Sequence, residues 1–173
     1  MNIFLIGFMG TGKSTISAVL GKELSTEVIE MDELIVKRQG MPISQIFETR
    51  GEEYFRELET GLLVELQQRD GVIVSCGGGT PMRECNVAEM KKSGIIVLLT
   101  ARPETIFERV RYSHNRPLIE HNKTVEYIAE LLEKRRENYE AAADVTIATD
   151  GKDTREICRE IQDSVKEWEK QSC

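Results

Sequence analysis

The segment that most constrains the fold of this chain is residues 7–14, Gly-Phe-Met-Gly-Thr-Gly-Lys-Ser. It matches the pattern G-x-x-x-x-G-K-[ST], in which a glycine-rich loop wraps phosphate groups with its backbone N–H groups. The apolar run at 3–6 predicts a buried strand before the loop, and the run at 15–20 predicts a helix after it. A phosphate-binding loop requires a strand and a helix in these places, so a Gly-rich turn without function is the less favoured interpretation.

The residue types of the loop predict a site for a nucleoside triphosphate. The N-terminus of the following helix adds partial positive charge, and the ammonium group of Lys13 reaches the outer phosphates. The hydroxyl of Ser14 stands where this pattern provides a ligand for Mg²⁺. The expected nucleotide-binding residues are Gly10, Thr11, Gly12, Lys13, Ser14 and Thr15, with Ser14 also the metal ligand.

Length and composition narrow the class of protein. The 173 residues are enough for one domain with a sizeable core, and we expect a single domain over 1–173. The net charge is −7 and no stretch is strongly basic, which argues against binding to nucleic acid or a membrane and favours small diffusible substrates. The four cysteines form no C-x-x-C pair, and no apolar run has the length of a signal peptide core or a membrane span. We therefore expect a soluble, cytoplasmic protein. We also expect it to be a monomer.

Apolar runs and helical patterns alternate along the chain. Continuous apolar runs are typical of strands that are buried on both faces of a parallel sheet. This order predicts an α/β fold of three layers, α/β/α, with a five-stranded parallel sheet and ligands at the carboxyl ends of the strands. Strands are expected at 3–6, 27–31, 72–76, 95–99 and 145–148, and helices after the loop, through 34–38, from 43, from 51, over 103–111, over 123–139 and, with a capping-box-like start, from 153.

Polar or glycine residues follow two of the expected strands. Asp32 follows the second strand, where it could receive or align the proton of an acceptor hydroxyl, or could simply be the N-cap of a helix. The residue alone does not separate these two readings. Gly77-Gly78-Gly79 follows the third strand and is either a flexible turn or a place where a ligand touches the backbone closely, and we favour the second.

Three arginines are candidates for holding anionic groups. Arg56 lies three residues before Glu59 on a predicted helix, a spacing that by itself favours an exposed ion pair over an arginine presented to a substrate. Arg116 lies in a polar segment, 112–122, that reads either as solvated chain or as a lid whose arginine neutralises a transferred phosphoryl group. Arg135, inside Lys-Arg-Arg, has the pattern of a solvated helix face.

Taken together, these motifs resemble those of the shikimate kinases over residues 7–139. The resemblance implies the fold of the nucleoside monophosphate kinases and transfer of the γ-phosphoryl group of ATP, with Mg²⁺, to the 3-hydroxyl of shikimate in aromatic amino-acid biosynthesis. The substrate-binding segment would span about 32–60 and the lid about 112–122. Both ATP and shikimate are small molecules, so the resemblance implies neither a nucleic-acid nor a membrane partner.

The resemblance also assigns roles to individual positions. Lys13, Asp32 and Arg116 would be catalytic, and Arg109 would stack on adenine and bind the nucleotide with Arg116. Arg135, in an R-x-x-x-Y pair with Tyr139, would bind the shikimate carboxylate, since a guanidinium fork matches a carboxylate. The implied substrate-binding residues are Asp32, Arg56, Gly77, Gly78, Gly79 and Arg135.

Two positions depart from the family pattern. Glu30 stands where the family often has an aspartate, so support of Mg²⁺ through water would fall to a longer carboxylate. The segment 148–152 lacks the proline often found in the adenine-binding loop, where we expect backbone contacts to hold the base.

Two other functions stay open from the sequence. A second small-molecule kinase of the same fold, such as a gluconate or nucleoside monophosphate kinase, shares the loop, and gluconate is also a hydroxy acid. A nucleotide-binding module that has lost catalysis is the other alternative, although Lys13, Ser14, Asp32 and Arg116 are all retained.

Overall fold

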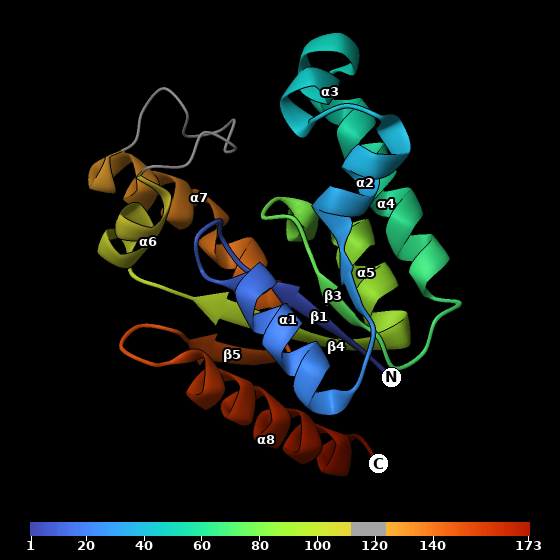
Figure 1. Cartoon of the computed structure of the whole chain (residues 1–173), viewed down its shortest axis with the longest axis vertical. Coiled ribbons are helices and arrows are strands. Elements are labelled where there is room, and N and C mark those ends of the chain that lie inside the picture. The colour runs from blue at the N-terminus through green and yellow to red at the C-terminus, as the bar shows by residue number, and fades with distance from the viewer. Residues whose placement is uncertain (112–123) are drawn as a thin grey trace.

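The computed structural model describes residues 1–111 and 124–173, and its centre is a parallel sheet of five strands. The strand order is β2-β3-β1-β4-β5, and Ile3 of β1 is in register with Ile73 of β3 and Ile95 of β4 (Figure 1). The predicted α/β fold with a five-stranded parallel sheet is confirmed. The strands are β1 (Asn2–Ile6), β2 (Val28–Glu30), β3 (Ile73–Ser75), β4 (Gly94–Thr100) and β5 (Val145–Ala148).

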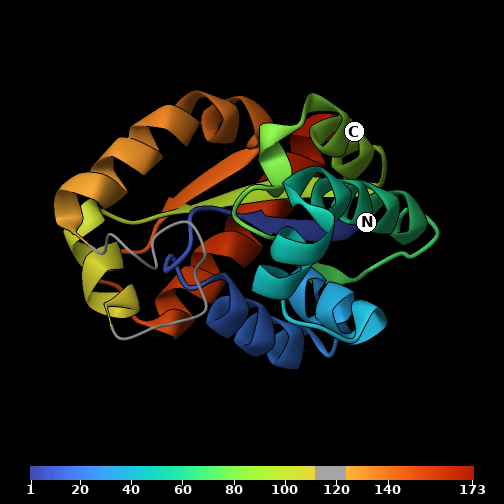
Figure 2. The same cartoon turned by 90° about the horizontal axis from the view of Figure 1, so that it is seen from above.

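Helices cover both faces of this sheet. Buried residues of α1 and α8 pack on one face, and those of α4, α5 and α7 pack on the other. Seen from above, α1 (blue) and α7 (orange) lie on opposite sides of the strands (Figure 2). The helices α2, α3 and α4 rise together beyond the carboxyl ends of the strands on the β2 side. The helices are α1 (Lys13–Leu24), α2 (Met31–Gln39), α3 (Ile43–Arg50), α4 (Glu52–Leu66), α5 (Glu84–Ser93), α6 (Pro103–Val110), α7 (Val125–Ala142) and α8 (Thr154–Ser172), with a short 3₁₀ turn at Thr80–Met82.

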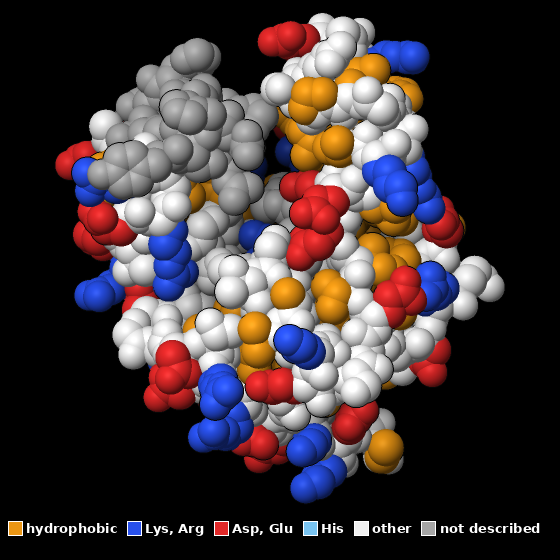
Figure 3. Space-filling model, viewed as in Figure 1, with side chains coloured by type: hydrophobic (Ala, Val, Ile, Leu, Met, Phe, Trp, Pro, Cys, Tyr) orange, Lys and Arg blue, Asp and Glu red, His pale blue; other side chains and the backbone are white. Residues whose placement is uncertain are grey.

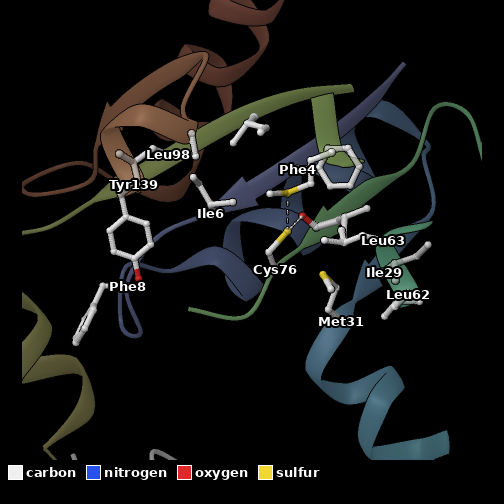
Figure 4. Packing of buried hydrophobic residues seen from close by; sticks show 14 of the residues in the cluster. Phe4, Ile6, Phe8, Ile29, Met31, Leu62, Leu63, Cys76, Leu98 and Tyr139 are labelled. Atoms are coloured by element: carbon white, nitrogen blue, oxygen red, sulfur yellow. Dashed lines mark hydrogen bonds between the residues drawn. The ribbon is translucent and has the colours of Figure 1, made fainter. Parts of the chain in front are cut away.

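Alternate residues of each strand enter different layers of the core because successive side chains of a strand point to opposite faces. In β4, Ile95, Val97 and Leu99 pack with residues of α1 and α8 such as Leu20 and Ile161. The residues between them, Ile96 and Leu98, belong to the other layer, which includes Phe4, Ile6, Leu62, Leu63 and Tyr139 (Figure 4). This two-sided burial explains why the strands read as continuous apolar runs.

The loops after the strands meet at one edge of the sheet because all five strands run the same way. β1 lies in the middle, with β3 on one side and β4 on the other. The loop at 7–12, which follows β1, therefore has the segment after β3 and the segment after β4 as neighbours. This is the edge where the sequence predicts the functional residues.

Several predicted boundaries were wrong by one to three residues, and one helix was missed. The helix after β2 begins at Met31 rather than after Asp32, because Met31 is buried in the first turn, and α7 continues to Ala142, which is also buried. α5 was not predicted, since only Asn86 and Met90 in it are buried and its apolar stripe is short. The predicted lid at 112–122, with Arg116, lies outside the described residues.

In the described ranges, 1–111 and 124–173, none of the helices is long and apolar enough to cross a membrane.

The predicted capping box at the start of α8 is confirmed, and its loss should destabilise the fold. Asp153 Oδ1 accepts a hydrogen bond from the Glu156 N–H (2.9 Å), and Glu156 Oε2 accepts one from the Asp153 N–H (2.8 Å). We expect Asp153→Ala to lower the free energy of unfolding by about 1 kcal/mol in urea titrations. Asp163→Ala, on an exposed part of the same helix, should change it by less than about 0.5 kcal/mol. Equal effects of the two substitutions would contradict a capping role.

Candidate active site

A cleft of about 1180 Å³ opens at the carboxyl edge of the sheet. It is visible as the hollow beside α2, where acidic side chains gather at the surface (Figure 3). Its walls come from the loop at 7–12, the first turns of α1 and α2, the helix α3, and the end of β3. Predicted site residues on its surface are Gly10, Gly12, Lys13, Ser14, Thr15, Asp32, Gly77, Gly78 and Arg109.

The loop at 7–12 has the backbone shape that its glycines permit. Gly10 (φ 77°) and Gly12 (φ 94°) lie in the left-handed region, and Gly12 is the N-cap of α1. The first N–H groups of a helix have no partner within the helix, so the start of α1 presents donors and positive dipole charge at the cleft. Thr11 differs from the rest of the predicted set, because its side chain is buried and its hydroxyl donates to Phe8 O (2.8 Å), which supports the loop from inside.

Lys13 lies across this loop. Its Nζ donates to Gly7 O (2.6 Å) and to Phe8 O (3.0 Å), and its side chain lines the cleft. The positive charge is therefore held next to the N–H donors of the loop, and both favour an anion at this point.

The hydroxyl of Ser14 is oriented by Glu30, the residue that departs from the family pattern. Ser14 Oγ donates to Glu30 Oε2 (3.1 Å), and the buried Ser17 Oγ lies 3.1 Å from Glu30 Oε1. Because Ser14 gives its proton to Glu30, its lone pairs stay available to a cation. Within residues 1–111 and 124–173, no cluster of three or more His, Cys, Asp and Glu side chains is placed to hold a metal ion. A hard cation at Ser14 would therefore take most of its ligands from phosphate and water.

Asp32 lies in the first turn of α2, at the cleft surface next to Gly77. The N-cap of this helix is Glu30, so the reading of Asp32 as a plain N-cap is wrong. A Cβ built on Gly77 would lie 2.9 Å from Asp32 Oδ1, which shows how closely the carboxylate approaches the backbone after β3.

Arg56 and Glu59 form an ion pair in which the carboxylate is buried and the guanidinium is partly buried, so the expectation of an exposed pair is wrong. Arg56 Nη1 lies 2.6 Å from Glu59 Oε1 and Nη2 lies 3.2 Å from Glu52 Oε1, while Glu59 is fully buried and also accepts a hydrogen bond from Thr80. Burial lowers the pKa of Arg56, but the charges and hydrogen bonds of Glu59 and Glu52 outweigh it and raise the pKa above its ordinary value. The guanidinium is charged and fixed in direction.

The glycine triplet makes room for charged side chains. None of Gly77, Gly78 and Gly79 has a positive φ, so backbone conformation does not require glycine here. Space does: a Cβ at Gly79 would lie 2.5 Å from the Arg56 guanidinium nitrogens, and one at Gly77 would lie 3.0 Å from Glu59 Oε2. At Gly77 and Gly79 the glycines therefore accommodate side chains of the protein itself, and close contact of a ligand with this backbone stays a prediction.

Arg135 lies against the same triplet, so its reading as a solvated helix residue is also wrong. Its Nη1 would be 3.5 Å from a Cβ on Gly78 and is 3.5 Å from the Tyr139 hydroxyl, and its guanidinium lies 5.8 Å from the centre of the Phe8 ring. Tyr139 Oη donates to Gly78 O (2.6 Å). Burial raises the pKa of Tyr139, and the charges of Arg135 and Arg56 oppose that rise, so both arginines act on one hydroxyl.

Arg109 joins the loop at 7–12 to the segment after β5. Its Nη1 donates to Gly10 O (2.9 Å) and lies 3.4 Å from Thr149 Oγ1. Arg116, the remaining predicted arginine, lies outside the described residues.

Three residues with roles in this arrangement were not predicted. Ser17 could have been found, since it lies one helical turn after Ser14 and shares its face. Phe8, at a variable position of the loop motif, and Thr80, in the 3₁₀ turn, carry no pattern that points to Arg135 or Glu59.

Comparisons with known proteins agree on one family. The family model described as shikimate kinase matches residues 9–166. A shikimate kinase of Dehalococcoides mccartyi is 40% identical over 171 residues, which cover 99% of this chain and 97% of that protein. One from Geobacter sulfurreducens is 41% identical over 166 residues, 96% of this chain and 91% of that protein.

Solved structures of shikimate kinases are also similar to this chain. The shikimate kinase of Acinetobacter baumannii in complex with shikimate superposes with a TM-score of 0.88 at 34% identity, covering 93% of this chain and 90% of that one. That of Aquifex aeolicus has a TM-score of 0.83 at 37% identity, covering 96% of each chain. A gluconokinase of Sinorhizobium meliloti has a TM-score of 0.62 at 19% identity over 96% of this chain and 91% of that one, a likeness of fold alone.

The buried position of Glu59 predicts that its charge stabilises the fold. In Glu59→Gln the partly buried Arg56 loses the closer of its two carboxylate partners and keeps Glu52, and we expect the free energy of unfolding to fall by about 1–3 kcal/mol in urea titrations. The matched control is Glu65→Gln, which breaks an exposed pair with Arg38 and should cost less than about 1 kcal/mol. A loss at Glu59 no larger than that at Glu65 would show that burial adds nothing to this pair.

Proposed function

The chain belongs to the shikimate kinase family, and we propose that it transfers the γ-phosphoryl group of ATP to the 3-hydroxyl of shikimate, giving shikimate 3-phosphate and ADP in aromatic amino-acid biosynthesis. The observation that carries the proposal is the cleft itself. The phosphate-binding loop forms one wall of the cleft, and Gly77 and Gly78 form part of another. Arg56 and Arg135 are not among the lining residues, but Arg56 lies next to Gly79, and Arg135 lies next to Gly78 and Phe8. A phosphate donor and a hydroxy acid fit together in such a cleft.

The nucleotide phosphates would lie in the loop at 7–12 and at the start of α1. The N–H groups from Gly10 to Thr15 and the ammonium of Lys13 would bind the β- and γ-phosphates. Lys13 would then stabilise charge on the transferred group, helped by Arg116, and Arg109 would stack on the adenine. Donors held in place before the reaction cost no reorganisation as charge develops.

Ser14 is the proposed protein ligand of Mg²⁺. The hydrogen bond from Ser14 Oγ to Glu30 Oε2 orients the Ser14 hydroxyl. Ser17 Oγ is within hydrogen-bond distance of the other carboxylate oxygen, Oε1, which helps to hold Glu30 in one orientation. The oxygen donors at this point suit a hard cation, so the longer carboxylate at position 30 fits the supporting role. When bound, the cation would neutralise charge on the β- and γ-phosphate oxygens.

Asp32 is the proposed partner of the acceptor hydroxyl. Its carboxylate would accept the hydrogen bond of the 3-hydroxyl and align it with the γ-phosphorus, and would receive the proton as the new bond forms. Phosphoryl transfer depends mainly on positioning and charge neutralisation, so alignment of the 3-hydroxyl is the main contribution of Asp32 to the rate.

Arg56 and Arg135 are the proposed binding residues of the shikimate carboxylate, and Gly77, Gly78 and Gly79 would contact shikimate through their backbone. Arg56 is held by Glu59 and Glu52 and Arg135 stacks over Phe8, so little side-chain freedom remains to be lost on binding. A guanidinium fork matches a carboxylate with two parallel hydrogen bonds. We also propose that the protein acts as a monomer in the cytoplasm, with these two small molecules as its substrates.

The proposed reaction is tested by ADP release in a coupled assay with ATP and Mg²⁺. Addition of shikimate should stimulate ADP release, while gluconate and nucleoside monophosphates at equal concentration should not. Gluconate is an open chain without a ring hydroxyl to present to Asp32, and a nucleoside monophosphate has no carboxylate for Arg56 and Arg135 to bind. Stimulation by another acceptor and not by shikimate would transfer the assignment to that acceptor. ATP binding without turnover on any of them would indicate a nucleotide-binding module.

A second prediction concerns the geometry of the carboxylate site. Arg135→Lys retains the charge but loses the planar fork, so we expect the KM for shikimate to rise about tenfold or more while the KM for ATP changes little. Arg136→Lys is the matched control, because Arg136 is exposed on the same helix and pairs with Glu133. Unchanged kinetics in Arg135→Lys would remove Arg135 from the substrate site.

A further inference from the structure

Asp150, in the loop between β5 and α8, holds the first turn of α6. Its Oδ1 accepts hydrogen bonds from the Arg102 N–H (3.1 Å) and from the Thr105 hydroxyl (2.6 Å), and it lies 3.7 Å from Arg102 Nε. Burial acts to raise the pKa of Asp150, but the bonds from Thr105 and Arg102 outweigh it and lower the pKa. The carboxylate is therefore ionised at neutral pH.

This contact caps α6 from a distant part of the chain. The N-cap position of α6 is Arg102, a residue type that does not cap through its side chain. Asp150 instead supplies the acceptor and places a negative charge at the positive end of the helix dipole. In Figure 1 the loop after β5 lies on the same side of the molecule as α6, at the end of the sheet opposite α2 and α3.

The same loop also contacts the other end of α6, where Arg109 lies. Thr149 is buried, its hydroxyl donates to Thr100 O (2.8 Å), and its oxygen lies 3.4 Å from Arg109 Nη1. Two neighbouring residues of one loop thus hold the helix at its first turn and at the side chain of its last turn.

α6 in turn packs directly on the nucleotide-binding loop. A Cβ at Gly10 would lie 2.9 Å from Val110 Cγ1 and 3.3 Å from Ile106 Cγ2, and Arg109 donates to Gly10 O. A shift of α6 would therefore move Arg109 relative to the loop that binds the phosphates. Asp150 itself is not among the residues that line the cleft, so it acts through the helix.

We infer that Asp150 is a positioning residue for the base end of ATP, because it ties the 149–152 loop to α6 and so fixes Arg109 beside the nucleotide-binding loop. This inference rests on the proposed function, in which Arg109 stacks on adenine. It goes beyond that function because it makes the affinity for the nucleotide base depend on the hydrogen bonds of Asp150 to Arg102 and Thr105, which lie far from it in the sequence.

The inference is tested by steady-state kinetics of four variants of the full chain. In Asp150→Ala both hydrogen bonds are lost, and we expect the KM for ATP to rise about tenfold while kcat and the KM for shikimate change less than about twofold. Asp150→Asn keeps an oxygen that can accept both bonds, so it should restore most of the affinity. Thr105→Val removes one donor and should raise the KM for ATP by a smaller factor. Combined with Asp150→Ala it should add nothing, because its partner is already gone.

Asp163→Asn is the matched control, since it removes the same charge from an exposed part of α8 and should leave all constants unchanged. An unchanged KM for ATP in Asp150→Ala would overturn the inference. Equal rises in both KM values, or additive effects of Thr105→Val and Asp150→Ala, would show a general loss of structure and would overturn it as well.

A separate measurement distinguishes failure of this inference from failure of the proposed function. Binding of ADP, followed by calorimetry, does not depend on which acceptor the enzyme uses. We expect Asp150→Ala to weaken ADP binding about tenfold and Asp163→Asn to leave it unchanged. If shikimate failed to stimulate ADP release but this difference in ADP affinity held, the acceptor assignment would be wrong and the role of Asp150 would stand. Equal affinities of the two variants would refute that role.

Discussion

Burial of both faces of a parallel sheet is the constraint on which the rest of the structure depends. Since all five strands run the same way, the loops that follow them meet at one edge, and the central position of β1 puts the nucleotide-binding loop between the segments after β3 and β4. Two apolar layers, one with α1 and α8 and the other with α4, α5 and α7, bury the two faces of the sheet below that edge. The cleft is a consequence of strand direction and strand order.

The acceptor side of the cleft concentrates charge in a small, partly buried space. Glu59 is fully buried between Arg56, Thr80 and the glycine triplet, and Arg135 is stacked over Phe8 beside the same triplet. A buried charge is tolerated only when it is paired and hydrogen-bonded. The buried Glu59 carboxylate meets this condition through Arg56 and Thr80, and it holds the Arg56 guanidinium in place in return. Glycine at positions 77 and 79 makes room for this packing, because a Cβ at either position would collide with the charged groups, whereas one at Gly78 would be in ordinary contact with Arg135. The site is thus arranged before a substrate arrives.

The nucleotide side is held differently, through a helix rather than through buried ion pairs. α6 lies between Gly10 and the loop after β5, and Thr149 and Asp150 hold its two ends. The carboxylate that caps α6 and the arginine that donates to Gly10 are on different segments, yet both depend on the position of one short helix. The hydrogen bonds at the α6 ends are short-range and directional, so a small displacement weakens them steeply.

The sequence by itself determined the loop motif, the alternation of strands and helices, and the residue types of the family, because these depend on local pattern: a glycine spacing, an apolar run, a capping box. Five parallel strands could be predicted in this way, and so could the place of Lys13 and Ser14 at the cleft. Only the tertiary structure decided that the Glu59 carboxylate paired with Arg56 is buried, that Arg135 packs on Phe8, and that Asp150 caps α6. Spacing along a helix gives the distance between two side chains but not what covers them, and the partner of Asp150 lies 45 positions away. Burial and long-range pairing arise when the chain folds back on itself, and no local pattern records them.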